Sequence, residues 1–166
     1  MANTVPLVKT SELFQVGIAV ANLEHSMKIY NSMLGVDSWK VFTVDSSIAK
    51  MTYKGKPSQH SFKVGLAMLG PLMLELLQPL EGDGVYQDHL NKHGEGIHHL
   101  GHVRVDDLDQ AIRTMEAAGF PCLEIGRPLD VRAHLWAYID TSSALGYALE
   151  LTSGGMDPRL MFAARR

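Results

Sequence analysis

Apolar and polar residues alternate over residues 13–20, which predicts a strand with one apolar face. The other face of this strand is small and polar, with Gln15, Gly17 and Ala19. Asn22 is placed to cap a helix over residues 23–34, where apolar side chains recur at helical spacing, and Gly35 ends the helix. The chain therefore opens with a strand and an amphipathic helix.

Further strands are expected after this helix, at residues 39–44, 48–53, 62–68 and 72–77. Residues 45–47 form a turn between the first two, and residues 69–71 join the last two as a pair. A polar turn at residues 78–84 follows, and Asp83 is expected to cap a short helix over residues 85–93. The first unit is thus strand, helix, then several strands.

The second half of the chain repeats the first. QVGIAVANL at residues 15–23 corresponds to HLGHVRVDDL at residues 99–108, and LMLEL at residues 72–76 to YALEL at residues 147–151. Asp107 is expected to cap a helix over residues 108–118 that Gly119 ends. The remaining expected strands are residues 97–105, 123–125, 134–140 and 147–152. One extra residue between Gly101 and Leu108, relative to the first half, predicts a β-bulge.

The composition of the chain is that of an ordinary globular protein. A chain of 166 residues with 46% hydrophobic residues and a net charge of −3 can bury a core as one domain. It has no apolar run long enough to cross a membrane, residues 1–9 do not form a signal peptide, and its basic residues are scattered. We therefore expect a cytoplasmic protein that binds neither membrane nor nucleic acid. Cys122, the single cysteine, is expected to be buried and inert.

Three segments resemble the vicinal oxygen chelate (glyoxalase/bleomycin resistance/dioxygenase) superfamily, and methylmalonyl-CoA epimerase-like proteins in particular. They are KVGLAMLGPLMLELLQPL at residues 63–80, HGEGIHH at residues 93–99 and GYALE at residues 146–150. The resemblance implies an α+β fold of paired βαβββ modules, forming a curled mixed sheet around a metal-binding cleft. The modules span about residues 11–80 and 97–153, joined by a helical linker, in a single domain of residues 1–166.

The resemblance also implies four metal ligands, at Gln15, Glu75, His99 and Glu150. Alternation supports this set, because it puts small residues beside the ligands on the same face, namely Gly17, Ala19, Gly101 and Ala148. Two carboxylates, an amide and one imidazole form an oxygen-rich set whose charge balances one divalent ion. We expect Mg²⁺, Mn²⁺ or Co²⁺, with iron, nickel or zinc as alternatives.

Other interpretations of these residues stay open at this point. The two glutamates would also suit a buried ion pair, and Gln15 would also suit a hydrogen bond that orients a ligand. His102 competes with His99 because the predicted bulge can change which side chain faces inward, whereas His98 is expected on the opposite face. The remaining histidines are expected to face solvent, among them His25, His60, His89 and His93.

The epimerase chemistry implied by the resemblance stabilises an enolate at the metal while acid and base groups exchange the α-proton. Glu150 matches one of the two carboxylates, and the other falls on Gln59, which cannot accept a proton at ordinary pH. His60 would replace it if a shift of register turned its side chain inward. Tyr138 and His134 are further candidates.

The sequence thus favours a metal-dependent isomerase of epimerase type, or a lyase, that acts on a small acyl substrate, with a CoA thioester first among the candidates. One alternative is an oxygenase, although iron in such enzymes is usually held by two histidines and one carboxylate. A second alternative is a non-catalytic small-molecule binding protein of the resistance type. The resemblance also suggests a homodimer. The tail at residues 152–162 carries apolar residues suited to lie across a partner, and a disordered tail is the equal alternative.

Overall fold

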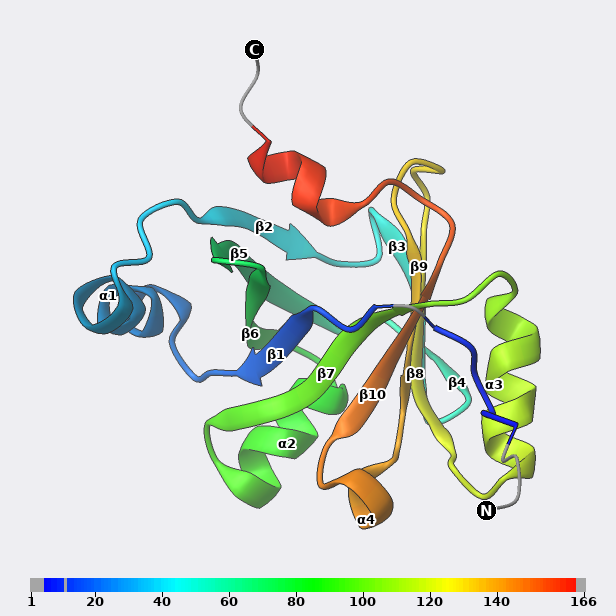
Figure 1. Cartoon of the computed structure of the whole chain (residues 1–166). Helices are drawn as coiled ribbons and strands as arrows, with labels where there is room; N and C mark the ends of the chain where they lie inside the picture. Colours follow the sequence, from blue (N-terminus) through cyan, green and yellow to red (C-terminus); the bar gives the residue numbers. More distant parts are fainter. Residues whose placement is uncertain (1–4, 11, 164–166) are drawn as a thin grey trace.

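The computed structural model describes residues 5–10 and 12–163, whose strands form one curled mixed sheet (Figure 1). The strand order is β2-β5-β6-β1-β7-β10-β9-β8-β3-β4. The strands are β1 (Gln15–Ala19), β2 (Lys40–Val44), β3 (Ala49–Tyr53), β4 (Lys56–Ser58), β5 (Ser61–Leu69), β6 (Leu72–Glu81), β7 (Gly96–Arg104), β8 (Cys122–Pro128), β9 (Leu135–Ile139) and β10 (Ala148–Ser153). The helices are α1 (Leu23–Leu34), α2 (Val85–His93), α3 (Leu108–Ala117), α4 (Ser142–Leu145) and the 3₁₀ helix η1 (Pro158–Phe162).

Two units of similar topology make up this sheet. In each unit the first strand pairs in parallel with the last, β1 with β6 and β7 with β10, and the antiparallel pair β1–β7 joins the units. Helix α1 packs on β5 and β6 of the first unit, and α3 packs on β8, β9 and β10 in the other half of the sheet. The two helices therefore lie at the left and right of the molecule in Figure 1. This confirms the predicted α+β fold. The module boundaries at residues 11–80 and 97–153 stay a proposal, and residue 11 lies outside the described residues.

The strands on either side of the turn at residues 45–47 do not pair with each other. β2 pairs with β5, whereas β3 forms a hairpin with the short strand β4 and also pairs with β8 of the second unit. The sequence predicts β3 but neither β4 nor this pairing. The hairpin covers an edge of β8 that would otherwise expose unpaired backbone groups.

The helix ends follow the expected capping chemistry at two of three N-termini. Asn22 and Asp107 each accept a hydrogen bond from a backbone N–H in the first turn of their helix, and Gly35 ends α1 in the left-handed conformation. The prediction that Asp83 caps α2 is wrong. The helix begins at Val85, as expected, so the N-cap position falls on Gly84, which has no side chain to accept a cap bond.

The C-terminal segment lies against its own chain. η1 contacts β5, and Met156, Leu160 and Met161 line the large cavity described below. The sequence considers this tail as a segment that lies across a partner subunit, whereas here it contacts its own chain. The homodimer itself stays a prediction. Among the described residues no helix is long and apolar enough to span a bilayer. Residues 1–4, part of the segment considered for a signal peptide, lie outside the described residues.

Candidate metal centre

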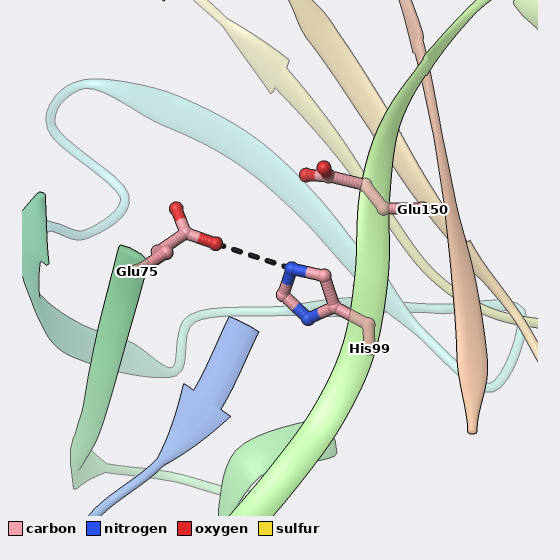
Figure 2. Close-up of side chains that lie close together, drawn as sticks. All are labelled: Glu75, His99 and Glu150. Carbon is pink, nitrogen blue, oxygen red and sulfur yellow. Dashed lines mark ion pairs between the residues drawn. The ribbon is translucent and has the colours of Figure 1, made fainter. Parts of the chain in front are cut away.

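Three of the four residues expected as metal ligands meet at the centre of the sheet. Glu75 lies on β6, His99 on β7 and Glu150 on β10. One potential ligand atom of each lies within 4.8 Å of the others, and Figure 2 shows the three side chains pointing toward one another. Residues from both units therefore build one site.

The strand register explains why these side chains converge. Gly17 on β1 is paired with Glu75 on one side and with His99 on the other, and His99 is paired with Ala148. Directly paired residues project from the same face of a sheet, and Glu150 follows two positions after Ala148 on that face. One row across four strands thus carries Glu75 and His99, with the small residues Gly17 and Ala148 beside them, and Glu150 lies next to this row.

The small residues make room for the ligand side chains themselves. A Cβ on Gly17 would lie 1.9 Å from the Cε1 atom of the His99 ring, and one on Gly101 would lie 2.4 Å from Oε2 of Glu150. The sequence predicts that these positions leave space for a metal and its substrate. In the structure that space holds the imidazole and the carboxylate, so each glycine allows one ligand to reach the centre.

The predicted bulge in β7 orients Glu150. Leu149 is paired with Leu100 and Leu151 with Val103, so Gly101 and His102 both lie opposite Glu150. His102 adopts a φ of 61°, and its backbone N–H donates a 2.9 Å hydrogen bond to Oε2 of Glu150. The extra residue thus places a hydrogen-bond donor beside the carboxylate.

The histidine that faces the two glutamates is His99. Its Nε2 lies 3.2 Å from Oε2 of Glu75, while its Nδ1 lies 2.9 Å from Nδ1 of His98. His98, which precedes it on β7, is buried as well. His102 is also buried, but its ring packs against Phe14 and His134, away from this contact.

Gln15 is buried next to the cluster and lines the same cavity. Against the larger effect of burial, its side chain acts to lower the pKa of the Glu75 carboxyl. This interaction matches the orienting role considered for Gln15 and puts its amide beside the three other side chains.

Burial dominates the electrostatics of the centre. It raises the pKa of Glu75 to about 8 and that of Glu150 to about 7, and it lowers the pKa of His99. The His99 imidazole, the backbone N–H of His102 and a hydrogen bond with Tyr138 oppose the rise at Glu150. Two buried carboxyl groups so close together resist ionisation unless a cation compensates them.

A divalent ion fits this set of donors. Oε2 of Glu75 and Nε2 of His99 are buried and have no hydrogen-bond partner among residues 5–10 and 12–163, although they lie 3.2 Å apart. Two adjacent ligands of an octahedral ion, each bound at about 2.1 Å, lie about 3 Å apart. An ion between them would satisfy both orphaned atoms and balance the two carboxylates.

The two residues expected to supply the second acid or base lie elsewhere. Gln59 is exposed, and His60 is buried, not in a solvent-facing loop as expected by default. His60 directs Nε2 to within 3.1 Å of Oε2 of the buried Glu124, and its Nδ1 lies 2.8 Å from Oγ of Ser58. Neither Gln59 nor His60 lines the cavity at the candidate centre.

Two tyrosines next to the candidate centre contact each other, and the sequence does not predict this contact. The hydroxyl groups of Tyr86 and Tyr138 lie 2.6 Å apart, both side chains are buried, and the Tyr138 ring lies 4.7 Å from that of His99. Tyr86 lies in the first turn of α2, the segment that the sequence describes only as a linker. A buried tyrosine requires a hydrogen-bond partner, so this pair fixes Tyr138 beside Glu150.

A cavity of about 650 Å³ opens beside the centre, with Gln15, Glu75 and Glu150 at its polar end. Its other walls are mostly apolar and come from β2, β3, β5, β9 and the C-terminal segment. The candidate metal centre is therefore accessible to a small molecule.

Comparisons with known proteins bear on the family and the fold. The sequence profile described as the glyoxalase/bleomycin resistance protein/dioxygenase superfamily matches residues 14–136. No curated protein sequence matches the chain significantly.

Solved structures with the same fold include methylmalonyl-CoA epimerases. The one from Mycobacterium tuberculosis is 24% identical over 97% of this chain and 98% of that chain, with a TM-score of 0.63. A variant of the Streptomyces coelicolor enzyme in complex with 2-nitronate-propionyl-CoA is 18% identical over 89% of this chain and 100% of that chain, with a TM-score of 0.62. A methylmalonyl-CoA epimerase in complex with methylmalonyl-CoA and NH₄⁺ is 18% identical over 88% and 96%, with a TM-score of 0.61.

Proposed function

Because the chain belongs to the glyoxalase/bleomycin resistance protein/dioxygenase superfamily, we propose that it is a metal-dependent enzyme that transfers a proton next to a carbonyl group. The observation that carries this proposal is the convergence of Glu75, His99 and Glu150, of which the two glutamates line a cavity. The reaction class is that of an isomerase of epimerase type, or of a lyase that begins with the same proton abstraction.

In this proposal Glu75, His99 and Glu150 hold one divalent ion, and Gln15 orients Glu75 or completes the ligand set. When bound, the ion withdraws electrons from a carbonyl oxygen and so lowers the cost of forming an enolate. His98 fixes the orientation of the His99 ring through its contact with Nδ1. Mg²⁺, Mn²⁺ and Co²⁺ are the ions that this oxygen-rich set favours.

Glu150 is the group that we assign to proton transfer. It lines the cavity, and the His102 backbone N–H and the Tyr138 side chain hold its carboxylate in place. A single carboxylate can remove a proton from one carbon and return it to another without a second base. The positions of Gln59 and His60 outside the cavity favour a one-base reaction, which includes an epimerisation through Glu150 alone, over an epimerisation that needs two bases.

Deuterium exchange tests this function. The metal-loaded protein is incubated in D₂O with a panel of CoA thioesters and free oxo acids, and labelling of the carbon next to the carbonyl is followed by NMR. We expect exchange in at least one compound, dependent on the metal and abolished in Glu150→Gln. Equal labelling with wild-type, Glu150→Gln and metal-free protein would contradict the proposal.

A second candidate function is binding without turnover. It is favoured by the same observation that disfavours the two-base reaction, namely that neither Gln59 nor His60 lines the cavity. In that case a ligand recovered from the protein in D₂O would be chemically unchanged and unlabelled. An oxygenase is disfavoured because the cluster contains one histidine instead of two.

A further inference from the structure

We infer that the substrate is a bulky, largely apolar carbonyl compound without phosphate groups, whose oxygen-bearing end lies at the candidate metal centre. This inference rests on the proposed function and narrows its substrate, away from the CoA thioesters that the sequence favours. It follows from the size, lining and charge of the cavity.

The cavity is larger than a short acyl group requires. Its volume is about 650 Å³. Water occupies about 30 Å³ per molecule in the liquid, so the cavity has room for roughly 20 non-hydrogen atoms. A four-carbon acyl group would leave most of this space to water. A molecule with one or two rings, or a long branched chain, would fill it.

The walls beyond the polar end are apolar and come from distant parts of the sequence. Phe42 and Val64 lie on the first unit, Trp136 on the second, and Leu160 and Met161 on the C-terminal helix η1. Phe42, Leu160 and Met161 remain 39%, 61% and 46% exposed. Apolar side chains left partly exposed around a cavity gain most from a ligand that covers them.

The charges around the cavity disfavour a phosphorylated handle. Among the described residues that line the cavity, one is a lysine or arginine, namely Arg132. Its guanidinium already forms an ion pair with Asp130 at 2.7 Å. Asp130 and Asp157 also line the cavity, and their negative charge would repel a phosphate group. Phosphate groups are usually recognised by unpaired arginines and lysines, so nothing in this lining recognises the nucleotide part of CoA.

Ligand binding to the whole protein tests this inference, in the metal-free and Co²⁺-loaded forms. The probes are N-phenyl-1-naphthylamine, a neutral two-ring dye that fluoresces when buried, and two oxo acids that differ in size, pyruvate and 3-(2-naphthyl)pyruvate. We expect the dye to bind both forms and naphthylpyruvate to bind the Co²⁺ form at least about tenfold more tightly than pyruvate. Free CoA should not displace the dye.

Two neighbouring residues on edge strand β2 provide matched variants. Phe42 lines the cavity, whereas Val41 points to the other side of the strand, and both are partly exposed, so a charge at either position is compatible with folding. Phe42→Glu should weaken binding of the dye and of naphthylpyruvate by about tenfold or more, and leave pyruvate and Co²⁺ binding unchanged. Val41→Glu should change neither.

The outcomes separate this inference from the proposed function. Displacement of the dye by CoA, equal affinity for the two oxo acids, absence of dye binding, or equal effects of Phe42→Glu and Val41→Glu would each overturn the apolar substrate. Failure to bind Co²⁺ would overturn the metal-dependent function. Dye binding that is lost in Phe42→Glu would then still support the apolar ligand.

Discussion

The His99 imidazole lies directly over Gly17, where a Cβ would fall 1.9 Å from Cε1 of the ring. Gly17 is also the residue that separates Glu75 and His99 across the sheet. The absence of a side chain at this position therefore allows two ligands from non-adjacent strands to approach each other.

Gly17→Ala should displace the His99 ring and lower the affinity for Co²⁺ or Mn²⁺ by about tenfold to a hundredfold, the range typical of disturbed ligand orientation. Isothermal titration with the metal measures this effect. Gly96→Ala on β7 is the matched control, because a Cβ there meets no atom within 4 Å. Equal metal affinity in the two variants would show that His99 does not need its present position.

The pH dependence of stability should differ in sign between the apoprotein and the metal-bound protein. The pKa of Glu75 is raised to about 8 and that of Glu150 to about 7, so the folded apoprotein keeps protons that the unfolded chain has released above pH 4.5. The free energy of unfolding of the apoprotein should fall as the pH rises from about 6.5 to 8. Below that range the buried histidines with lowered pKa act in the opposite direction.

A metal ion requires both carboxylates in their ionised form, so its affinity should rise over the same pH interval and binding should release protons. Thermal melts at pH 6.5, 7.2 and 8.0, with and without Co²⁺, measure both trends. A melting temperature of the apoprotein that increases over this range would contradict the raised carboxyl pKa values. Metal stabilisation that decreases with pH would contradict ligation by the carboxylates.

Glu150→Gln should separate the role of Glu150 in proton transfer from its role in metal binding. The amide keeps an oxygen donor but cannot accept a proton, so we expect isotope exchange to fall by at least about a hundredfold. Metal binding should be weakened rather than lost, because Glu75 and His99 remain. Glu81→Gln, an exposed residue at the end of β6, serves as the control. Unchanged exchange in Glu150→Gln would remove Glu150 from the reaction.

His60 should prove important for stability rather than for proton transfer. Its side chain and that of Glu124 are 3% and 0% exposed and lie 3.1 Å apart. His60→Gln leaves the Glu124 carboxylate without its partner, and breaking such a buried pair costs about 3 to 5 kcal/mol. Urea unfolding measures this loss, with exposed Gln59→Ala as the neutral control. Loss of exchange in a fully folded His60→Gln protein would restore His60 as a candidate acid or base.

The sequence predicts the local structure well because the relevant signals are local. The caps Asn22 and Asp107 follow from residues within one turn of their helices, and the bulge at Gly101 follows from comparing the second half of the chain with the first. The pairing of β3 with β8 does not, because it joins segments about 70 residues apart that carry no mutual signature.

The site was partly predictable for the same reason. The family resemblance implies Glu75, His99 and Glu150, alternation supports them by placing small residues beside them, and the structure brings the three together. The burial of His60 depends on Gly82 and Gly84, whose missing side chains leave room for its ring, and on Glu124, a carboxylate within an apolar strand. The position of Glu124 within an apolar strand is the feature of the sequence that indicates a buried partner for its carboxylate.

The central claim is that Glu75, His99 and Glu150 hold a metal ion, and metal content tests it most directly. The purified protein and a Glu75→Ala, Glu150→Ala double variant are loaded with Co²⁺ or Mn²⁺, dialysed and measured by mass spectrometry. We predict close to one equivalent of divalent metal in the wild-type protein and almost none in the variant. No metal in the loaded wild-type protein, or the same content in both proteins, would contradict the claim.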